Sequence, residues 1–280
     1  MSKITSTSLH NLNADTGLNL WQKPAYLFLN FLNNLFPYTN IDPRIRFDKF
    51  SPSTEKFESE WKNTYATSSA PRKFSDLFWR TLPWDNIRRE LGGEIRIFDT
   101  GCGHGNYAVR IQEGSGGLIT SYTGVDAKRR PNWAELEKVH PNFKFIESRS
   151  ANILSLIPEG TNVFVTQSAI EHFDKDIQFF EQISEYITKS SFPVMQIHLF
   201  PAAATLSLYL FHGLRQYTPR TISKIARLFP KAGISLFSLG GEASKKLHWR
   251  YFTWPVLITR RYAKPTFDAS EYEPKLRQAV

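Results

Sequence analysis

A glycine-rich turn directly after a short apolar strand constrains this chain more than any other feature. Residues 94–99 read as a strand, Gly101, Gly103 and Gly105 follow it, and a helix is expected over 104–112. Glycines have no Cβ, so the backbone there can bend sharply and approach a ligand closely. This order of elements predicts a ligand site at the carboxyl end of a strand.

Strand and helix signals alternate along most of the chain. Further strands are expected at 121–126, 143–147, 162–167, 193–200, 234–239 and 248–258, with helices at 133–140, 177–188 and 221–229. Such alternation predicts an α/β fold with a mostly parallel sheet covered by helices on both faces.

Three segments are expected from composition. Residues 1–60 form an N-terminal extension with one amphipathic helix within Trp21 to Tyr38. The main domain covers 61–262, opens with a helix at 74–91 that ends at a pair of glycines, and carries an apolar, aromatic insertion at 200–218. Residues 263–280 form a polar tail. Ligands of doubly wound sheets lie beyond the carboxyl ends of the strands, so the insertion is expected to roof the acceptor pocket.

Two acidic residues indicate which ligand the turn holds. Asp99 precedes the first glycine by two positions, where its charge would repel a pyrophosphate and attract an amino group. Asp126 ends the next strand, at the spacing where an acid meets ribose hydroxyls. The pair therefore favours a ligand with an amino group and a ribose over a dinucleotide.

The run from Asp99 to Gly105, D-x-G-C-G-x-G, resembles motif I of class I S-adenosylmethionine (SAM)-dependent methyltransferases. The run from Gln167 to Phe173, with its Glu-His pair, resembles the segment that follows the fourth strand of the same family. The resemblance covers roughly residues 94–240 and is to the branch that O-methylates small molecules and sugars. It implies a Rossmann-like sheet of seven strands, SAM as cofactor and S-adenosylhomocysteine as product. The cofactor-binding residues that it implies are Asp99, Gly101, Cys102, Gly103, Gly105, Tyr107, Asp126, Ala127, Ser150, Ala151, Gln167 and Ser168. Ser150 stands where the family often has an aspartate, although a hydroxyl can still accept that hydrogen bond.

Catalysis by such an enzyme mainly requires alignment of an acceptor, because the methyl group of SAM is already activated. If the acceptor is a hydroxyl, a histidine base is useful. The candidate catalytic residues are His172 with the neighbouring Glu171, and His198, with a structural role for each histidine as the alternative. Some relatives bind a metal through Glu-x-x-Glu-His, but Ser168 replaces the first glutamate here. No metal site is therefore expected.

The acceptor is left open among several classes. A net charge of +9 and an aromatic content of 14% suit a sugar or glycan precursor, with or without a phosphate, of surface-polysaccharide or natural-product biosynthesis. An RNA methyltransferase, an enzyme for lipid-linked acceptors that contacts the membrane surface, and a SAM-binding module without catalysis are the alternatives. The oligomeric state is also left open.

The compartment follows from what the sequence lacks. The chain has one cysteine, Cys102, which cannot form an internal disulfide and is expected to be a packing residue. Residues 1–20 do not read as a secretory signal, and no apolar stretch reaches the length of a membrane span. A cytoplasmic protein is expected.

Overall fold

The computed structural model describes residues 5–66, 68–259 and 268–279, which fall into two compact units. The first unit contains Met1–Asp42, Pro83–Ala203 and Phe211–Ala232, and the second contains Pro43–Leu82, Ala204–Leu210 and Gly233–Val280. The expected limits of the extension, main domain and tail stay a prediction. Residues 260–262 of that main domain and 263–267 of that tail lie outside the described residues.

The first unit is built on a parallel sheet of five strands, in the order β4-β3-β2-β5-β6. The strands are β2 (Arg96–Thr100), β3 (Ser121–Asp126), β4 (Phe143–Glu147), β5 (Val163–Gln167) and β6 (Met195–Leu199). Neighbouring strands are parallel throughout, and the order reverses between β2 and β5. This is the strand order of a doubly wound, Rossmann-like sheet, so the predicted α/β fold is confirmed.

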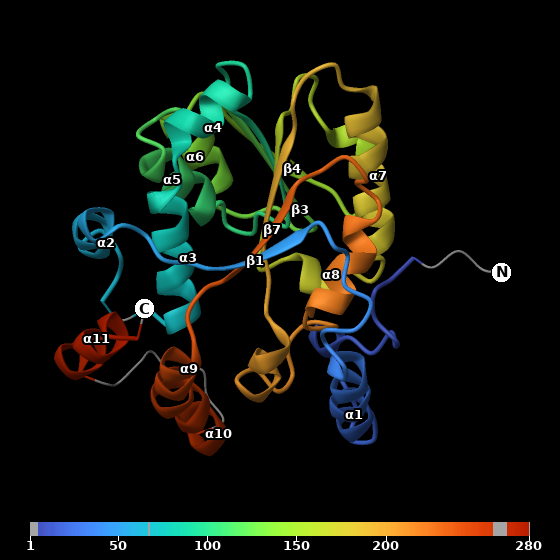
Figure 1. The fold of residues 1–280 in the computed structure, drawn as a ribbon, viewed down its shortest axis with the longest axis vertical. Helices are drawn as coiled ribbons and strands as arrows, with labels where there is room; N and C mark the ends of the chain where they lie inside the picture. The colour runs from blue at the N-terminus through green and yellow to red at the C-terminus, as the bar shows by residue number, and fades with distance from the viewer. Residues whose placement is uncertain (1–4, 67, 260–267, 280) are drawn as a thin grey trace. The chain divides into compact units, whose positions relative to one another are not determined.

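Helices cover both faces of this sheet (Figure 1). On one face lie α4 (Trp84–Glu90), α5 (Asn106–Gly114) and α6 (Trp133–Val139), and on the other lie α7 (Asp176–Lys189) and α8 (Pro219–Ala226). Alternate residues of a strand point to opposite faces, so Phe98 and Phe164 pack with Phe180 and Ile183 of α7. Burial of these side chains stabilises the unit, at about 2 kcal/mol for each large apolar group.

The prediction of seven strands in one sheet is not confirmed, because the described residues form a sheet of five strands and a sheet of two. The strand expected at 234–239 exists as β7 (Ile234–Ser238), but it pairs in parallel with β1 (Ile45–Lys49) as a separate sheet of two strands in the second unit. Only Ile45 of β1 is buried, so this strand needs few apolar residues. Residues 45–49 therefore give a weaker strand signal than the strands of the main sheet.

The strand expected at 248–258 is wrong, because this segment is helical. It contains the end of α9 (Glu242–His248), a turn of π-helix (Trp249–Thr253) and α10 (Trp254–Thr259). Leu247, Tyr251 and Phe252 pack against the core of the second unit. Their spacing is that of one helix face, and this packing outweighs the preference of aromatic residues for strands.

The single helix expected at 74–91 is two helices separated by a proline. Helix α3 (Ala70–Thr81) ends before Leu82, whose backbone is extended with φ −56° and ψ 144°, and α4 begins after Pro83. A residue before proline avoids the helical conformation, and proline has no N–H to continue the hydrogen bonds. The break coincides with the boundary between the two units.

The core of the second unit joins segments far apart in the sequence. Helices α2 (Thr54–Trp61), α3 and α11 (Ala269–Arg277) and the residue after β1 contribute its buried residues, and Leu247 of α9 packs against them. The buried members are Phe50, Trp61, Ala70, Phe74, Leu77, Tyr272 and Leu276.

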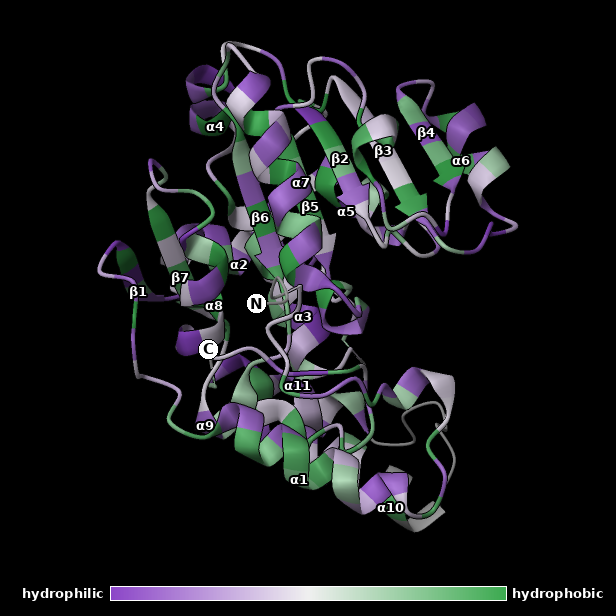
Figure 2. Cartoon of the chain, turned by 90° about the vertical axis from the view of Figure 1, so that its right-hand side faces the viewer, coloured by the Kyte–Doolittle hydropathy of each residue, from purple (hydrophilic) through white to green (hydrophobic). Residues whose placement is uncertain are grey.

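The helix expected in the extension is present as α1 (Gln22–Asn34), after a short 3-10 turn at Ala14–Thr16. Its buried residues are Tyr26, Asn30 and Asn33, whereas Phe28 and Phe31 are exposed. Figure 2 shows the apolar colouring on this helix. The Tyr26 hydroxyl donates a 2.9 Å hydrogen bond to the carbonyl oxygen of His212, so α1 supports the 211–218 loop.

Among the described helices, none has both the length and the hydropathy that a membrane crossing requires.

Candidate functional site

The turn after β2 contacts the segment after β5 at the point where the strand order reverses. Gly101 has φ +83°, and a Cβ there would lie 2.4 Å from the Cβ of Ala169. Only glycine fits this close approach. Ligands of doubly wound sheets bind at this reversal, so the turn lies where a ligand is expected.

The next part of the turn is open on one side. Gly103 has φ +55°, and a Cβ at this position would meet no described atom within 4 Å. The backbone can therefore be approached here by a ligand. Cys102, between the two glycines, is buried, and burial raises the pKa of its thiol, which fits the expected packing role.

Asp99 is a buried carboxyl group with one satisfied oxygen. Its Oδ2 accepts a hydrogen bond from the Tyr122 hydroxyl at 2.5 Å, and Oδ1 has no hydrogen-bond partner in the described part of the chain. Burial raises the pKa of Asp99 to about 7, against the opposing effect of the Tyr122 hydrogen bond. A buried oxygen without a partner is costly, so the Asp99 carboxyl group fits a ligand that donates hydrogen bonds or carries positive charge.

Asp126 connects the end of β3 to the glycine turn. Its Oδ2 accepts a hydrogen bond from the backbone N–H of Gly103 at 2.9 Å, and Oδ1 accepts one from the N–H of Lys128 at 3.1 Å. Arg130 lies 3.6 Å from Oδ1. A carboxylate can accept about four hydrogen bonds, so Asp126 retains capacity for ligand hydroxyls.

The other expected cofactor residues follow neighbouring strands at the same edge of the sheet. Tyr107 lies in the first turn of α5, Ala127 after β3, Ser150 and Ala151 after β4, and Gln167 and Ser168 at the end of β5. Ser150 is exposed, and its hydroxyl accepts a 3.0 Å hydrogen bond from the N–H of Asn152. The roles of these residues in binding stay predictions.

Glu171 forms a cluster with His172 and with His212, a residue that is not among the predicted site residues. Glu171 and His172 lie in a 3-10 turn, Ile170–His172, and the Glu171 carboxylate is fully buried. Its Oε1 lies 3.8 Å from Nε2 of His172 and 3.7 Å from Nε2 of His212. One ligand atom from each of the three residues lies within 4.8 Å of the others, an arrangement that can hold a metal ion.

The loop that carries His212 approaches Glu171 closely. The N–H of Leu214 donates a 2.9 Å hydrogen bond to the carbonyl oxygen of Glu171. Gly213 has φ +62°, and a Cβ there would lie 3.0 Å from that oxygen. The Glu171 carboxylate raises the pKa of His212.

The N-terminal extension supplies Asp15 to the same cluster. Oδ2 of Asp15 contacts Nδ1 of His172, and Oδ1 accepts a 3.4 Å hydrogen bond from the N–H of Gly213. No local pattern in the sequence links Asp15 to residues 157 and 198 positions away. Both Asp15 and His212 are therefore found only once the chain is folded.

His198 lies in a different environment from the cluster. Its Nδ1 is 2.9 Å from the Thr166 hydroxyl, and its ring packs against that of Phe180, with 5.0 Å between centroids. Burial lowers the pKa of His198 to about 3. These contacts favour the structural alternative for this residue, and its catalytic role stays a prediction.

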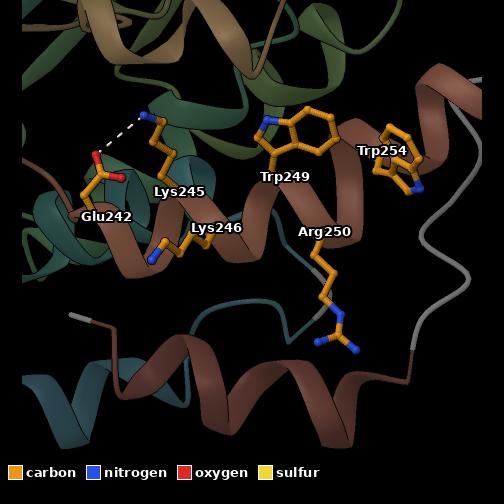
Figure 3. A pocket seen from close by; sticks show the side chains of 6 residues that line it. All are labelled: Glu242, Lys245, Lys246, Trp249, Arg250 and Trp254. Carbon is orange, nitrogen blue, oxygen red and sulfur yellow. Dashed lines mark ion pairs between the residues drawn. The ribbon is translucent and has the colours of Figure 1, made fainter.

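The second unit contains a separate surface cavity of about 460 Å³, lined by residues of α9, the π-helix and α10 (Figure 3). The ring centroids of Trp249 and Trp254 lie 5.4 Å apart, and Nζ of Lys245 lies 3.5 Å from Oε1 of Glu242. Lys246 and Arg250 complete the lining. Aromatic and cationic side chains thus line one cavity.

Comparisons with known proteins give only distant similarities. No family model matches the chain. No curated protein matches it.

Several solved structures are similar to parts of the chain. The YcgJ protein from Bacillus subtilis shares 13% identity over 52% of this chain and 65% of its own, with a TM-score of 0.37. A SAM-dependent methyltransferase from Aquifex aeolicus shares 16% over 40% and 64%, with a TM-score of 0.29. The plantazolicin methyltransferase BpumL, solved with S-adenosylhomocysteine, shares 15% over 82% and 87%, with a TM-score of 0.37. The matched region spans less than two thirds of the first two proteins.

Proposed function

We propose that the chain is a SAM-dependent methyltransferase. The observation that carries the proposal is the buried Asp99 carboxyl group, whose Oδ1 has no partner in the described structure, at the base of an open glycine turn. The α-amino group of SAM would supply both the hydrogen bonds and the positive charge that this oxygen lacks. Asp126, on the neighbouring strand, is the acceptor proposed for the ribose hydroxyls.

The residues of the chain would act mainly by positioning. When bound, SAM supplies an activated methyl group. The turn from Asp99 to Gly105 would hold its methionine part, and Gln167 and Ser168, at the end of β5, would line the acceptor side. Alignment of an acceptor oxygen with the methyl group can supply a large part of the rate enhancement. His172, beside Glu171, is the favoured base for a hydroxyl acceptor, and His198 is the weaker candidate.

A sugar or glycan precursor is the proposed acceptor, methylated on oxygen. The cavity of the second unit supports this choice, because sugars stack on aromatic faces and cationic side chains bind phosphate. Trp249 and Trp254 would contact the sugar, and a cationic residue of the lining, Lys246 or Arg250, would contact an attached phosphate. The acceptor would then belong to surface-polysaccharide or natural-product biosynthesis.

Calorimetric titration with SAM and with S-adenosylhomocysteine tests the cofactor directly. We expect micromolar binding that Asp99→Ala and Asp126→Ala each weaken at least tenfold, about 1.4 kcal/mol. Binding of neither compound by folded protein would overturn the proposal.

Transfer of a radiolabelled methyl group to a panel of sugars, sugar phosphates and RNA tests the acceptor. We expect product with a sugar-containing acceptor, and a KM that rises at least fivefold in Trp249→Ala. Tyr65→Ala, an exposed aromatic of the second unit that is not part of the cavity, is the matched control. Methylation of RNA alone would reject the sugar, and SAM binding with no turnover on any acceptor would indicate a binding module.

A lipid-linked acceptor is the second candidate, favoured by exposed apolar residues in α1 and at the position just before it. Trp21, Phe28 and Phe31 have 86%, 60% and 56% of their surface exposed. Such a face on a short helix can enter the headgroup region of a bilayer. Flotation with anionic vesicles, lost in the double variant Phe28→Ser, Phe31→Ser, would support this candidate, and protein that stays in the soluble fraction would remove it.

A further inference from the structure

No hydrogen bond among the described residues satisfies the buried carboxylate of Glu171. Its carboxylate is fully buried, and neither oxygen has a hydrogen-bond partner among the described residues. An ionised carboxylate in such a place costs several kcal/mol unless a cation or a strong donor faces it. Two imidazole nitrogens, Nε2 of His212 and Nε2 of His172, lie 3.7 and 3.8 Å from Oε1, within ion-pair range but beyond hydrogen-bond distance.

The contact between Asp15 and His172 fixes which nitrogen of the imidazole faces Glu171. A carboxylate only accepts hydrogen bonds, so Nδ1 of His172 carries the proton that it donates to Asp15. In the neutral ring, Nε2 then has a lone pair and lies 3.8 Å from a carboxylate oxygen. Two electron-rich atoms at this distance repel each other unless a positive charge lies between them.

We propose that Glu171, His172 and His212 hold one divalent transition-metal ion, for which zinc best matches the donor set. Two imidazole nitrogens and one carboxylate form a known ligand set for zinc, with a further position open to water or a substrate oxygen. Ligand atoms of one tetrahedral zinc ion lie about 3.4 Å apart. The observed separations of 3.7 and 3.8 Å approach this value, and small side-chain rotations bring the atoms to one ion.

The surroundings of the cluster fit this assignment in two further ways. Histidine ligands of metals usually donate their other N–H to a carboxylate, as His172 does to Asp15. The side chains of His172 and His212 are 31% and 41% exposed, so an ion can enter from solvent. The expectation of no metal site considered only Ser168, whereas the third ligand comes from the 211–218 loop.

The site lies on the segment next to the glycine turn. Glu171 follows Ala169, whose Cβ limits Gly101 to glycine. We expect the open position of the ion to accept an oxygen of water or of a bound molecule. A His172 that binds the ion through Nε2 has no free lone pair, so in the metal-bound protein it would not serve as the base for a hydroxyl acceptor. Binding of the metal itself does not depend on the proposed methyltransferase function.

The test is titration of the metal-free, untagged full chain with Zn²⁺ and with Co²⁺. We expect one equivalent of Zn²⁺ to bind, and Co²⁺ to give the visible absorption of a four-coordinate site. Glu171→Gln, His172→Gln and His212→Gln should each weaken Zn²⁺ binding at least a hundredfold, and Asp15→Asn about tenfold. His140→Gln, at the amino end of β4 and thus at the opposite edge of the sheet, should leave the affinity unchanged.

Circular dichroism separates loss of binding from loss of folding. The partly exposed His212 keeps the test usable if Glu171→Gln does not fold. No binding of either ion to the folded chain, or binding that His212→Gln leaves unchanged, would overturn the proposal. A parallel titration of the metal-free chain with SAM tests the cofactor separately, so either proposal can fail alone.

Discussion

The Tyr122 hydroxyl donates a 2.5 Å hydrogen bond to Oδ2 of Asp99 and leaves the other oxygen of that buried carboxyl group without a partner in the described structure. The two residues are on the adjacent strands β3 and β2. Burial raises the pKa of Asp99 to about 7, so the carboxyl group changes its charge near neutral pH. This property leads to two separate predictions.

The affinity for SAM should rise with pH around neutrality. If the amino group of SAM requires an ionised Asp99, only the deprotonated fraction of the protein binds, and this fraction grows about tenfold between pH 6 and pH 8 for a pKa of about 7. Calorimetry in buffers of different ionisation enthalpy should also detect the release of a proton on binding at pH 6. Equal affinity at both pH values would contradict this role for Asp99.

The stability of the free protein should fall as pH rises from about 4 to about 7. The folded state keeps the proton of Asp99 in this window, with a pKa of about 7, whereas the unfolded state has lost it above the usual value of 3.8. A shift of this size corresponds to a loss on the order of 4 kcal/mol in the free energy of unfolding. Asp99→Asn removes the titrating group, so urea denaturation should show a smaller loss across this window than in the wild type. Parallel curves for both proteins would be evidence against the raised pKa.

Gly101→Ala should destabilise the first unit strongly. The new Cβ would lie 2.4 Å from that of Ala169, at φ +83°, so overpacking and backbone strain together should cost about 2 to 5 kcal/mol. Gly103→Ala, at φ +55° with no described atom within 4 Å of its Cβ, should cost only about 1 kcal/mol. Adding Ala169→Gly to Gly101→Ala should recover more than 1 kcal/mol in chemical denaturation. No recovery would show that the contact with Ala169 is not the cause.

The parts of the fold that follow from local sequence could be predicted. The strands β2 to β6 are short segments rich in apolar residues that alternate with helices, and the glycines after β2 mark the turn, so the existence of a parallel sheet and the place of the turn follow from local pattern. The pairing of β1 with β7 could not be predicted in this way, because it joins segments about 190 residues apart and depends on the tertiary fold. The π-helix at Trp249–Thr253 likewise depends on packing in the second unit.

The candidate site divides in the same way. Asp99 and Asp126 occupy fixed positions relative to strand ends, so spacing alone predicts them. Asp15 and His212 reach the Glu171 cluster through the extension and the 211–218 loop, and their place is set by hydrogen bonds that no sequence period encodes. His198 is predicted from its position near the end of a strand. Successive residues of a strand face opposite sides of the sheet, and the ring of His198 faces the side where Phe180 lies.

Asp176→Asn should destabilise the first unit by about 3 to 5 kcal/mol, because it leaves a buried Arg215 without its counter-charge. The two side chains are fully buried with 3.0 Å between Oδ2 and Nη1, and the Tyr217 hydroxyl and the N–H of Thr7 also donate to Asp176. Glu185→Gln, which breaks an exposed ion pair with Lys189 on the same helix, should cost less than about 1 kcal/mol. Similar losses in both variants, measured by urea denaturation, would refute the assignment.

Glu273→Gln should destabilise the second unit more at pH 7 than at pH 9.5. Lys73 is fully buried, its Nζ lies 2.9 Å from Oε1 of Glu273 and 4.0 Å from the Trp61 ring centroid, and burial lowers the pKa of Lys73. A lysine whose pKa is lower in the folded state makes the free energy of unfolding rise with pH, up to the usual value of 10.5. Without Glu273 the pKa of Lys73 falls further, so the cost at pH 7, about 2 to 4 kcal/mol, should shrink at pH 9.5.

Replacing Lys73 by methionine in the Glu273→Gln variant removes the unpaired charge and should restore most of the stability lost, as measured by urea denaturation. A double variant no more stable than Glu273→Gln at pH 7 would mean that the glutamate acts through its 3.0 Å hydrogen bond from Trp61 instead.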